Sequence, residues 1–203
     1  KLGFTSRRTM MIAQQLYEGI SIGKKGPVGL ITYMRTDSTR VSDLAQSAAR
    51  DYISGNWDSA YMPAKPPVYA AKKDAQDAHE AVRPTDIALT PVIAEEFLSK
   101  EQFKLYRLIW QRFLASQMTP AVYDTMSISI KGGDYIAKAV GSVLKFAGYT
   151  AVYDEADKKK EKDVILPEVS AGDKMLLQKI LPEQHFTEPP PRYNDASIIK
   201  TLE

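Results

Sequence analysis

The chain of 203 residues contains no cysteine, which excludes disulfides, thiol catalysis and cysteine-ligated zinc sites built from its own residues. It also lacks any run of the roughly 18 to 20 apolar residues that a membrane-spanning helix requires. Its glycines at positions 23, 26 and 29 are not followed by Lys-Ser or Lys-Thr, so they form no P-loop. These absences predict a cytoplasmic protein with no membrane partner. The length of 203 residues predicts one large domain or two small ones.

The net charge of +2 neither requires nor excludes a polyanionic partner, so the distribution of charge matters more than its total. Seven of the first 40 residues are Lys or Arg and two are acidic, a local excess of five positive charges. A second basic run, at residues 158–160, is interpreted either as a nucleic-acid contact or as part of a solvated loop. The start of the chain is therefore the part best suited to an anionic partner.

Apolar periodicity predicts an α+β protein in which a helical domain is followed by an antiparallel β module. The predicted domains are 1–120, helical; 121–188, rich in β-strands; and 189–203, the truncated start of a further helical domain. Helices are predicted over residues 6–18, 42–54 and 74–82, from Thr90-Pro91, from Ser99 to Pro120 and after Asn194, and strands over 126–130, 135–140, 143–153 and 173–180.

One run, Gly-Leu-Ile-Thr-Tyr-Met-Arg-Thr-Asp-Ser at 29–38, combines an apolar lead-in with a tyrosine and an arginine two residues later. In an extended segment, Tyr33 and Arg35 would point to the same side and Met34 to the other. A free tyrosine has a pKa of about 10, so a phenolate nucleophile needs a fixed cation beside it, which also neutralises a phosphate under attack. The pair therefore fits attack on a phosphodiester, although both residues are also ordinary neighbours on a half-buried strand.

A second run, Asp-Ala-His-Glu-Ala-Val-Arg-Pro at 77–84, contains one of the two histidines of the chain. On a helix, His79 and Arg83 would lie four positions apart and present two phosphate-binding groups from one surface. The alternative is a surface helix end at which Arg83 interacts with the last carbonyl groups. An acidic group, Asp154, Glu155 and Asp157, lacks the rigid frame expected of a magnesium site, so no metal ligand is predicted in this chain.

These two runs closely resemble the active-site tyrosine motif and a histidine-containing motif of type IA DNA topoisomerases of the bacterial topoisomerase I kind. Further blocks at 1–11, 105–118 and 185–193 are also similar to that family and occur in the same order. The residue at position 34 is methionine, which favours topoisomerase I over topoisomerase III, where proline is usual. The topoisomerase core of a reverse gyrase is similar and stays an alternative.

The resemblance implies an enzyme that cleaves one DNA strand, passes a strand through the break and reseals it without ATP, relaxing negative supercoils. Tyr33 would form a 5′-phosphotyrosine, Arg35 would position the tyrosine and the phosphate, and His79 would contact the phosphate network. DNA contacts are expected of Thr32, Asp37, Ser38 and Arg83. The implied partners are single-stranded and negatively supercoiled DNA.

The resemblance also implies that the chain is a central fragment containing the tyrosine domain and half of the β arch. Mg²⁺ would be bound by a Toprim domain outside this chain, which the tyrosine domain would contact. Two other functional classes stay open: a noncatalytic module that binds single-stranded nucleic acid, and a structural scaffold in which Tyr33 is part of the core.

Overall fold

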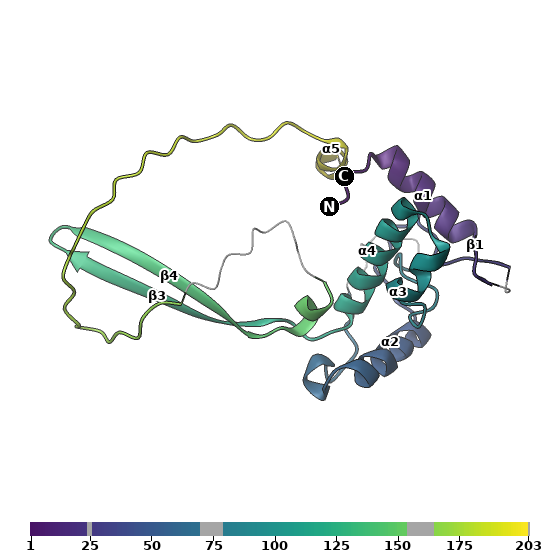
Figure 1. Ribbon diagram of the computed structural model, residues 1–203, viewed down its shortest axis with the longest axis horizontal. Coiled ribbons are helices and arrows are strands. Elements are labelled where there is room, and N and C mark those ends of the chain that lie inside the picture. The colour runs from purple at the N-terminus through teal and green to yellow at the C-terminus, as the bar shows by residue number, and fades with distance from the viewer. Residues whose placement is uncertain (24–25, 70–78, 154–164, 203) are drawn as a thin grey trace. The chain divides into compact units, whose positions relative to one another are not determined.

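The computed structural model describes residues 1–23, 26–69, 79–153 and 165–202 (Figure 1). The predicted helix at 74–82 and the basic and acidic groups at 154–160 lie mostly or wholly outside these residues. The described parts form two compact units, one within 1–124 and 143–162 and one within 125–142 and 163–203. In chain order the elements are α1 (Ser6–Glu18), β1 (Ile20–Ser21), β2 (Pro27–Val28), α2 (Asp43–Asn56), η2 (Ser59–Tyr61), α3 (Pro91–Ala94), η3 (Glu95–Phe97), α4 (Lys100–Ser116), β3 (Val122–Gly132), β4 (Tyr135–Phe146), η4 (Gly148–Ala151) and α5 (Asp195–Leu202).

The helix boundaries follow from capping residues that can be read in the sequence. The Thr5 side chain accepts a hydrogen bond from the backbone N–H of Arg8 at 3.2 Å, which begins α1. Ser99 and Gln102 form both hydrogen bonds of a capping box at the start of α4. Each cap satisfies amide groups that have no partner inside the helix, so the predicted starts of both helices are confirmed.

The core of the first unit is built where the apolar stripes of its helices meet. Helix α1 packs against α4, and α3 packs against the same helix (Figure 1). Trp110 and Tyr106 of α4 are buried, and each also donates a hydrogen bond, to the carbonyl groups of Ile87 and Leu89. The fully buried positions include Ile12 and Leu16 of α1, Ile53 of α2, Leu114 of α4, and Leu30 and Ile31 of the tyrosine segment.

The apolar pattern of α2 predicts that Leu44, Ala45, Ala48 and Tyr52 face inward, and the structure differs from it at Leu44. Leu44, expected to face inward, is 83% exposed, whereas Ala45, Ala49 and Ile53 form the buried stripe. The helix also continues past Gly55, the expected stop, to Asn56. Ala48 and Tyr52, which were also predicted to face inward, are partly buried against the core, so the predicted face was wrong only at Leu44.

The β module contains a single long hairpin among the described residues, with β3 and β4 paired. Gly133 at its turn has a φ of 61°, a left-handed conformation that glycine adopts without steric cost. The corner predicted at Gly141-Ser142 and a separate strand from 143 were wrong, because β4 continues to Phe146. The predicted strand at 173–180 was also wrong, since this segment forms no described ladder and its apolar side chains are exposed.

Candidate active site

The tyrosine segment is held by the second motif, which runs antiparallel beside it. The Thr32 backbone N–H donates to the Arg83 carbonyl at 2.9 Å, and the Thr85 N–H donates to the Leu30 carbonyl at 3.0 Å. Two motifs about 50 residues apart in sequence therefore form one local structure.

On its other side the segment touches the end of α1. The Leu30 N–H donates to the Leu16 carbonyl at 2.7 Å. A Cβ atom at Gly29 would lie 2.6 Å from the Tyr17 carbonyl oxygen, so only glycine allows this approach. The lead-in to the tyrosine is fixed between α1 and the second motif.

Burial along the segment follows the alternation expected of an extended chain. Met34 is buried, whereas Arg35 is exposed and Tyr33 keeps 37% of its surface accessible. None of the described residues forms a hydrogen bond with the Tyr33 hydroxyl or an ion pair with Arg35. The exposure of the Tyr33 side chain disfavours the interpretation of Tyr33 as a core residue.

Two rings contact the Tyr33 ring. The Tyr17 ring meets it edge-on at 5.4 Å between centroids, and the His79 ring is tilted by 47° at the same centroid distance. His79 is half-buried. Tyr33 and His79, predicted from separate motifs, are therefore neighbours, whereas Tyr17 was not predicted as a site residue.

The helical placement of the second motif was wrong for its described residues, because residues 79–83 are not helical. The segment is extended enough for Ala81 and Arg83 to hydrogen-bond with Thr32, and Pro84 disfavours helix just before it. His79 and Arg83 therefore do not share a helix face.

Arg83 is engaged within the chain. Its side chain is 13% exposed, and Nε donates to the Glu80 carboxylate at 2.8 Å, Nη1 to the Pro84 carbonyl at 3.0 Å and Nη2 to the Ser42 hydroxyl at 3.4 Å. Burial raises the pKa of Glu80, but the hydrogen bond and charge of Arg83, with hydrogen bonds from Ser42, outweigh it and leave this pKa below its ordinary value. Glu80 and Ser42 were not predicted as site residues, and the sequence holds no signal for the ion pair, because the i,i+3 rule applies to helices and this segment is not helical.

The Thr32 side chain is also hydrogen-bonded within the protein. Its hydroxyl donates to the Ala81 carbonyl at 2.8 Å and accepts from the Arg83 N–H at 3.0 Å. Asp37 is exposed and Ser38 half-buried, in a loop where the Ser38 hydroxyl accepts from the Arg40 N–H at 3.2 Å. The structure brings Thr32 and Arg83 together with Tyr33 and His79, and it places Asp37 and Ser38 on the loop that follows.

The described residues contain no group of three or more His, Asp or Glu side chains that could hold a metal ion. The acidic cluster at 154–157 lies outside them. The described residues thus do not fit a magnesium site.

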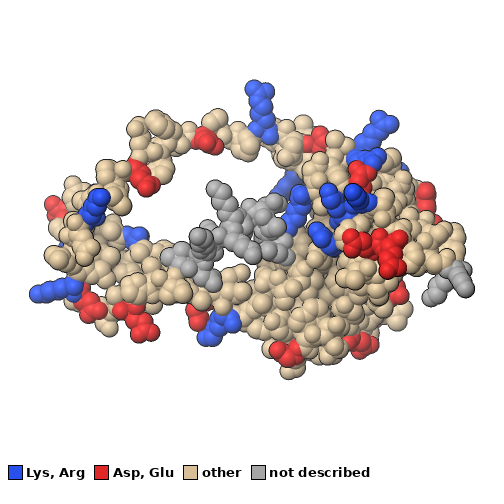
Figure 2. All heavy atoms as spheres, in the orientation of Figure 1, with Lys and Arg blue, Asp and Glu red and all other residues tan. Residues whose placement is uncertain are grey.

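On the visible face of the first unit, basic and acidic side chains lie close to one another (Figure 2). No helix among the described residues is long and apolar enough to cross a membrane.

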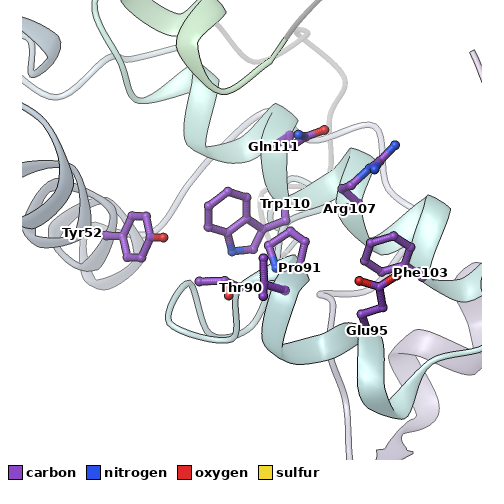
Figure 3. A pocket seen from close by; sticks show the side chains of 9 residues that line it. Tyr52, Thr90, Pro91, Glu95, Phe103, Arg107, Trp110 and Gln111 are labelled. Carbon is purple, nitrogen blue, oxygen red and sulfur yellow. The ribbon is translucent and has the colours of Figure 1, made fainter.

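A pocket of about 460 Å³ opens between α2, α3 and α4 (Figure 3). Its wall includes Tyr52, whose ring meets Trp110 edge-on at 5.5 Å, and Arg107, which lies over the Phe103 ring. None of the predicted site residues lines this pocket. The candidate site is instead the exposed surface around Tyr33.

The two motifs thus present a tyrosine, a histidine and an arginine from one α+β chain. The family model for DNA topoisomerase matches residues 1–203. The chain therefore belongs to the bacterial DNA topoisomerase family, of type IA.

A solved relative is full-length topoisomerase I from Thermotoga maritima, with 42% sequence identity and a TM-score of 0.69. The match covers 83% of this chain and 26% of that one. This chain thus corresponds to about a quarter of that enzyme, and the match supports the predicted α+β class.

Proposed function

We propose that this chain is the tyrosine-bearing part of a type IA topoisomerase and that Tyr33 is its nucleophile. The observation that carries the proposal is the Tyr33 side chain itself, exposed beside His79 on a segment fixed from both sides. A catalytic nucleophile must reach a phosphate yet stay positioned, and this combination meets both requirements.

In the proposed reaction the Tyr33 oxygen attacks a backbone phosphorus and loses its proton. The bond from phosphorus to the 3′ oxygen breaks, and the 3′ oxygen leaves as a hydroxyl after gaining a proton. A 5′-phosphotyrosine remains, and attack by the 3′ hydroxyl reverses both changes. The ester retains the energy of the original bond, so resealing needs no ATP.

Arg35 and His79 are proposed to act on the phosphate. Arg35 is exposed and has no ion-pair partner among the described residues, so its planar guanidinium can bind two phosphate oxygens. His79 contacts the Tyr33 ring and can bring a hydrogen-bond donor to the same phosphate. Asp37 and Ser38 remain proposed DNA contacts on the adjoining loop.

The substrates proposed for the whole enzyme are single-stranded and negatively supercoiled DNA in the cytoplasm. Mg²⁺ is assigned to a Toprim domain that contacts this module, and no step here depends on the metal. A noncatalytic single-strand binding module is the second candidate, because Arg35 could bind phosphate without chemistry. DNA cleavage by a longer protein carrying this chain separates an enzyme from a noncatalytic module, and the topoisomerase core of a reverse gyrase stays an alternative because it would also cleave.

The test is denaturing electrophoresis of the full-length enzyme with labelled single-stranded DNA. Tyr33→Phe is expected to abolish the covalent adduct, while Tyr17→Phe, which changes the neighbouring ring, should preserve it. Arg35→Lys should slow cleavage by about a hundredfold to a thousandfold, since lysine lacks the planar fork. An adduct that persists in Tyr33→Phe would refute the proposal, and the 203-residue chain alone is expected not to relax supercoiled DNA.

A further inference from the structure

The loop that carries Tyr33 is closed at both ends by the same short segment. At its start, the Thr32 N–H donates to the Arg83 carbonyl at 2.9 Å. At its end, the Ala81 N–H donates to the Arg40 carbonyl at 2.8 Å. The segment that follows His79 therefore bridges the two ends of the loop.

Side chains reinforce both connections. At the start of the loop, the Thr32 hydroxyl bonds to the Ala81 carbonyl and to the Arg83 N–H. At its end, the Arg83 guanidinium reaches the Ser42 hydroxyl while it also pairs with Glu80. Glu80 is the direct neighbour of His79, so the ion pair fixes the backbone from which the histidine ring extends.

The Ser42 side chain gives independent evidence for the contacts around Arg83 and Glu80. It occupies the N-cap position of α2 with an extended backbone, yet its side chain makes no capping hydrogen bond. Its hydroxyl lies instead at Arg83 and Glu80. A serine cap is worth about 1 kcal/mol, so the helix forgoes a common stabilising contact in favour of a tertiary one.

We propose that Glu80, Arg83 and Thr32 are positioning residues that clamp the Tyr33 loop and hold His79 against the Tyr33 ring. The proposal rests on the function assigned to Tyr33 above. It gives Arg83 and Thr32 a role inside the protein in place of the DNA contacts predicted for them. Three of the five N–H groups of the Arg83 guanidinium already donate to protein oxygens, and the side chain is only 13% exposed, so it is poorly placed to bind a phosphate.

Removal of the clamp should affect the chemical step more than DNA binding. A displacement of about 1 Å at a reacting group can reduce a rate by about a hundredfold. Glu80→Gln keeps the size of the side chain but removes the charge that holds Arg83. In the full-length enzyme we expect the single-turnover cleavage rate at saturating single-stranded DNA to fall about tenfold to a hundredfold, with the DNA dissociation constant within about twofold of wild type.

The matched control is Glu101→Gln. Glu101 also pairs with an arginine, Arg8, but the pair is at the surface between α1 and α4, with side chains 40% and 46% exposed. This variant should cleave at the wild-type rate. Equal slowing by Glu80→Gln and Glu101→Gln would overturn the proposal, since any ion pair in the unit would then be equivalent.

The Thr32 hydroxyl is tested with Thr32→Val, which keeps the branched shape, and Thr32→Ser, which keeps the hydroxyl. The valine variant should lower the rate constant of the active fraction, and the serine variant should restore it. A purely structural role would instead lower the melting temperature and the amplitude of cleavage while leaving that rate constant unchanged, and this result would overturn the proposal.

Arg83→Gln, which removes the positive charge, separates positioning from DNA contact. The clamp predicts a slower rate and unchanged salt dependence of binding, whereas a lost phosphate contact would weaken binding and reduce the salt slope by about 1. Tyr33→Phe is assayed in parallel. If it retains the adduct, the proposed function fails; if it loses the adduct while the Glu80, Arg83 and Thr32 variants cleave normally, only the clamp is refuted.

Discussion

In the first unit, the apolar stripes of α1, α2 and α4 meet in one core, whereas most of the large apolar side chains described in the second unit are exposed. Leu16 of α1 has no exposed surface, while Leu176 of the second unit is 87% exposed. None of the described residues of the second unit belongs to the buried hydrophobic core. Leucine is thus a core residue in the first unit and a surface residue in the second.

The comparison shows that apolar content does not identify a core. The β3–β4 hairpin exposes Tyr135 and Ile136, at 84% and 65%. A lone two-stranded hairpin is marginally stable in water, so its order depends on contacts beyond its own pairing. The first unit needs no such support, because its helices bury one another, and this is the unit that holds Tyr33.

The largest expected effect tests this difference directly. Leu16→Ala should lower the free energy of unfolding of the first unit by about 2 to 5 kcal/mol, because it leaves a cavity in a filled core. Leu176→Ala should change the free energy of unfolding by less than about 0.5 kcal/mol. Urea titration followed by tryptophan fluorescence reports the first unit, since Trp57 and Trp110 both lie in it. A similar loss in both variants would contradict the comparison.

A second test uses glycine on the site's supporting segment. Gly29→Ala should destabilise the first unit by about 1 to 3 kcal/mol, since its Cβ would meet the Tyr17 carbonyl oxygen at 2.6 Å. Gly55→Ala is the matched change in α2, where no atom lies within 4 Å of the added Cβ. That variant should be neutral or stabilised by up to about 1 kcal/mol, because alanine favours helix. Urea titration of both variants measures the contrast.

The sequence predicted the local parts of this fold well, since caps such as Thr5 and Ser99 act within a few residues. It failed where contacts between residues distant in sequence determine which side chains are buried and which strands pair. Leu44 follows the helical period yet faces solvent, and residues 173–180 have an apolar pattern but no described strand partner. Apolar alternation alone cannot reveal whether another part of the protein covers the apolar face of a segment.

The same limit applies to the site. Tyr33 and His79 could be named from their motifs, and the exposure of Tyr33 follows from the alternation around Met34. Their mutual contact depends on antiparallel pairing between segments about 50 residues apart, which periodicity does not encode. For that reason Arg83 was predicted as a DNA contact, with a helix-end role as the alternative, and its pairing with Glu80 emerged only from the structure.

A smaller effect is expected for a buried hydroxyl. The Tyr106 hydroxyl donates to the Leu89 carbonyl at 2.6 Å, and burial raises the pKa of Tyr106, with Asp86 adding to the shift. Tyr106→Phe should therefore lower the free energy of unfolding by about 1 kcal/mol, since the Leu89 carbonyl loses its partner. Tyr135→Phe, at an 84% exposed position of β4, should have no measurable effect. Urea titration at neutral pH compares the two, and equal effects would indicate that Tyr135 is also packed.

The smallest expected effect is the pH dependence of the Glu80–Arg83 pair. The folded state holds the pKa of Glu80 below the ordinary value of 4.5, so the unfolded chain binds a proton more readily than the folded one. The stabilisation is therefore fully present above pH 4.5 and is lost as the pH falls through the folded pKa. At pH 7, Glu80→Gln should lower the free energy of unfolding by about 1 kcal/mol.

Below pH 4.5 the difference between wild type and Glu80→Gln should shrink, because protonated Glu80 resembles glutamine. The control is Glu183→Gln in the second unit, whose partner His185 and own side chain are 81% and 74% exposed. Water screens that pair, so its loss should not change stability at either pH. Urea titrations at pH 7 and at pH 3.5 measure both variants. A Glu80→Gln deficit that stayed constant or grew on acidification would show that the carboxylate charge is not what holds Arg83.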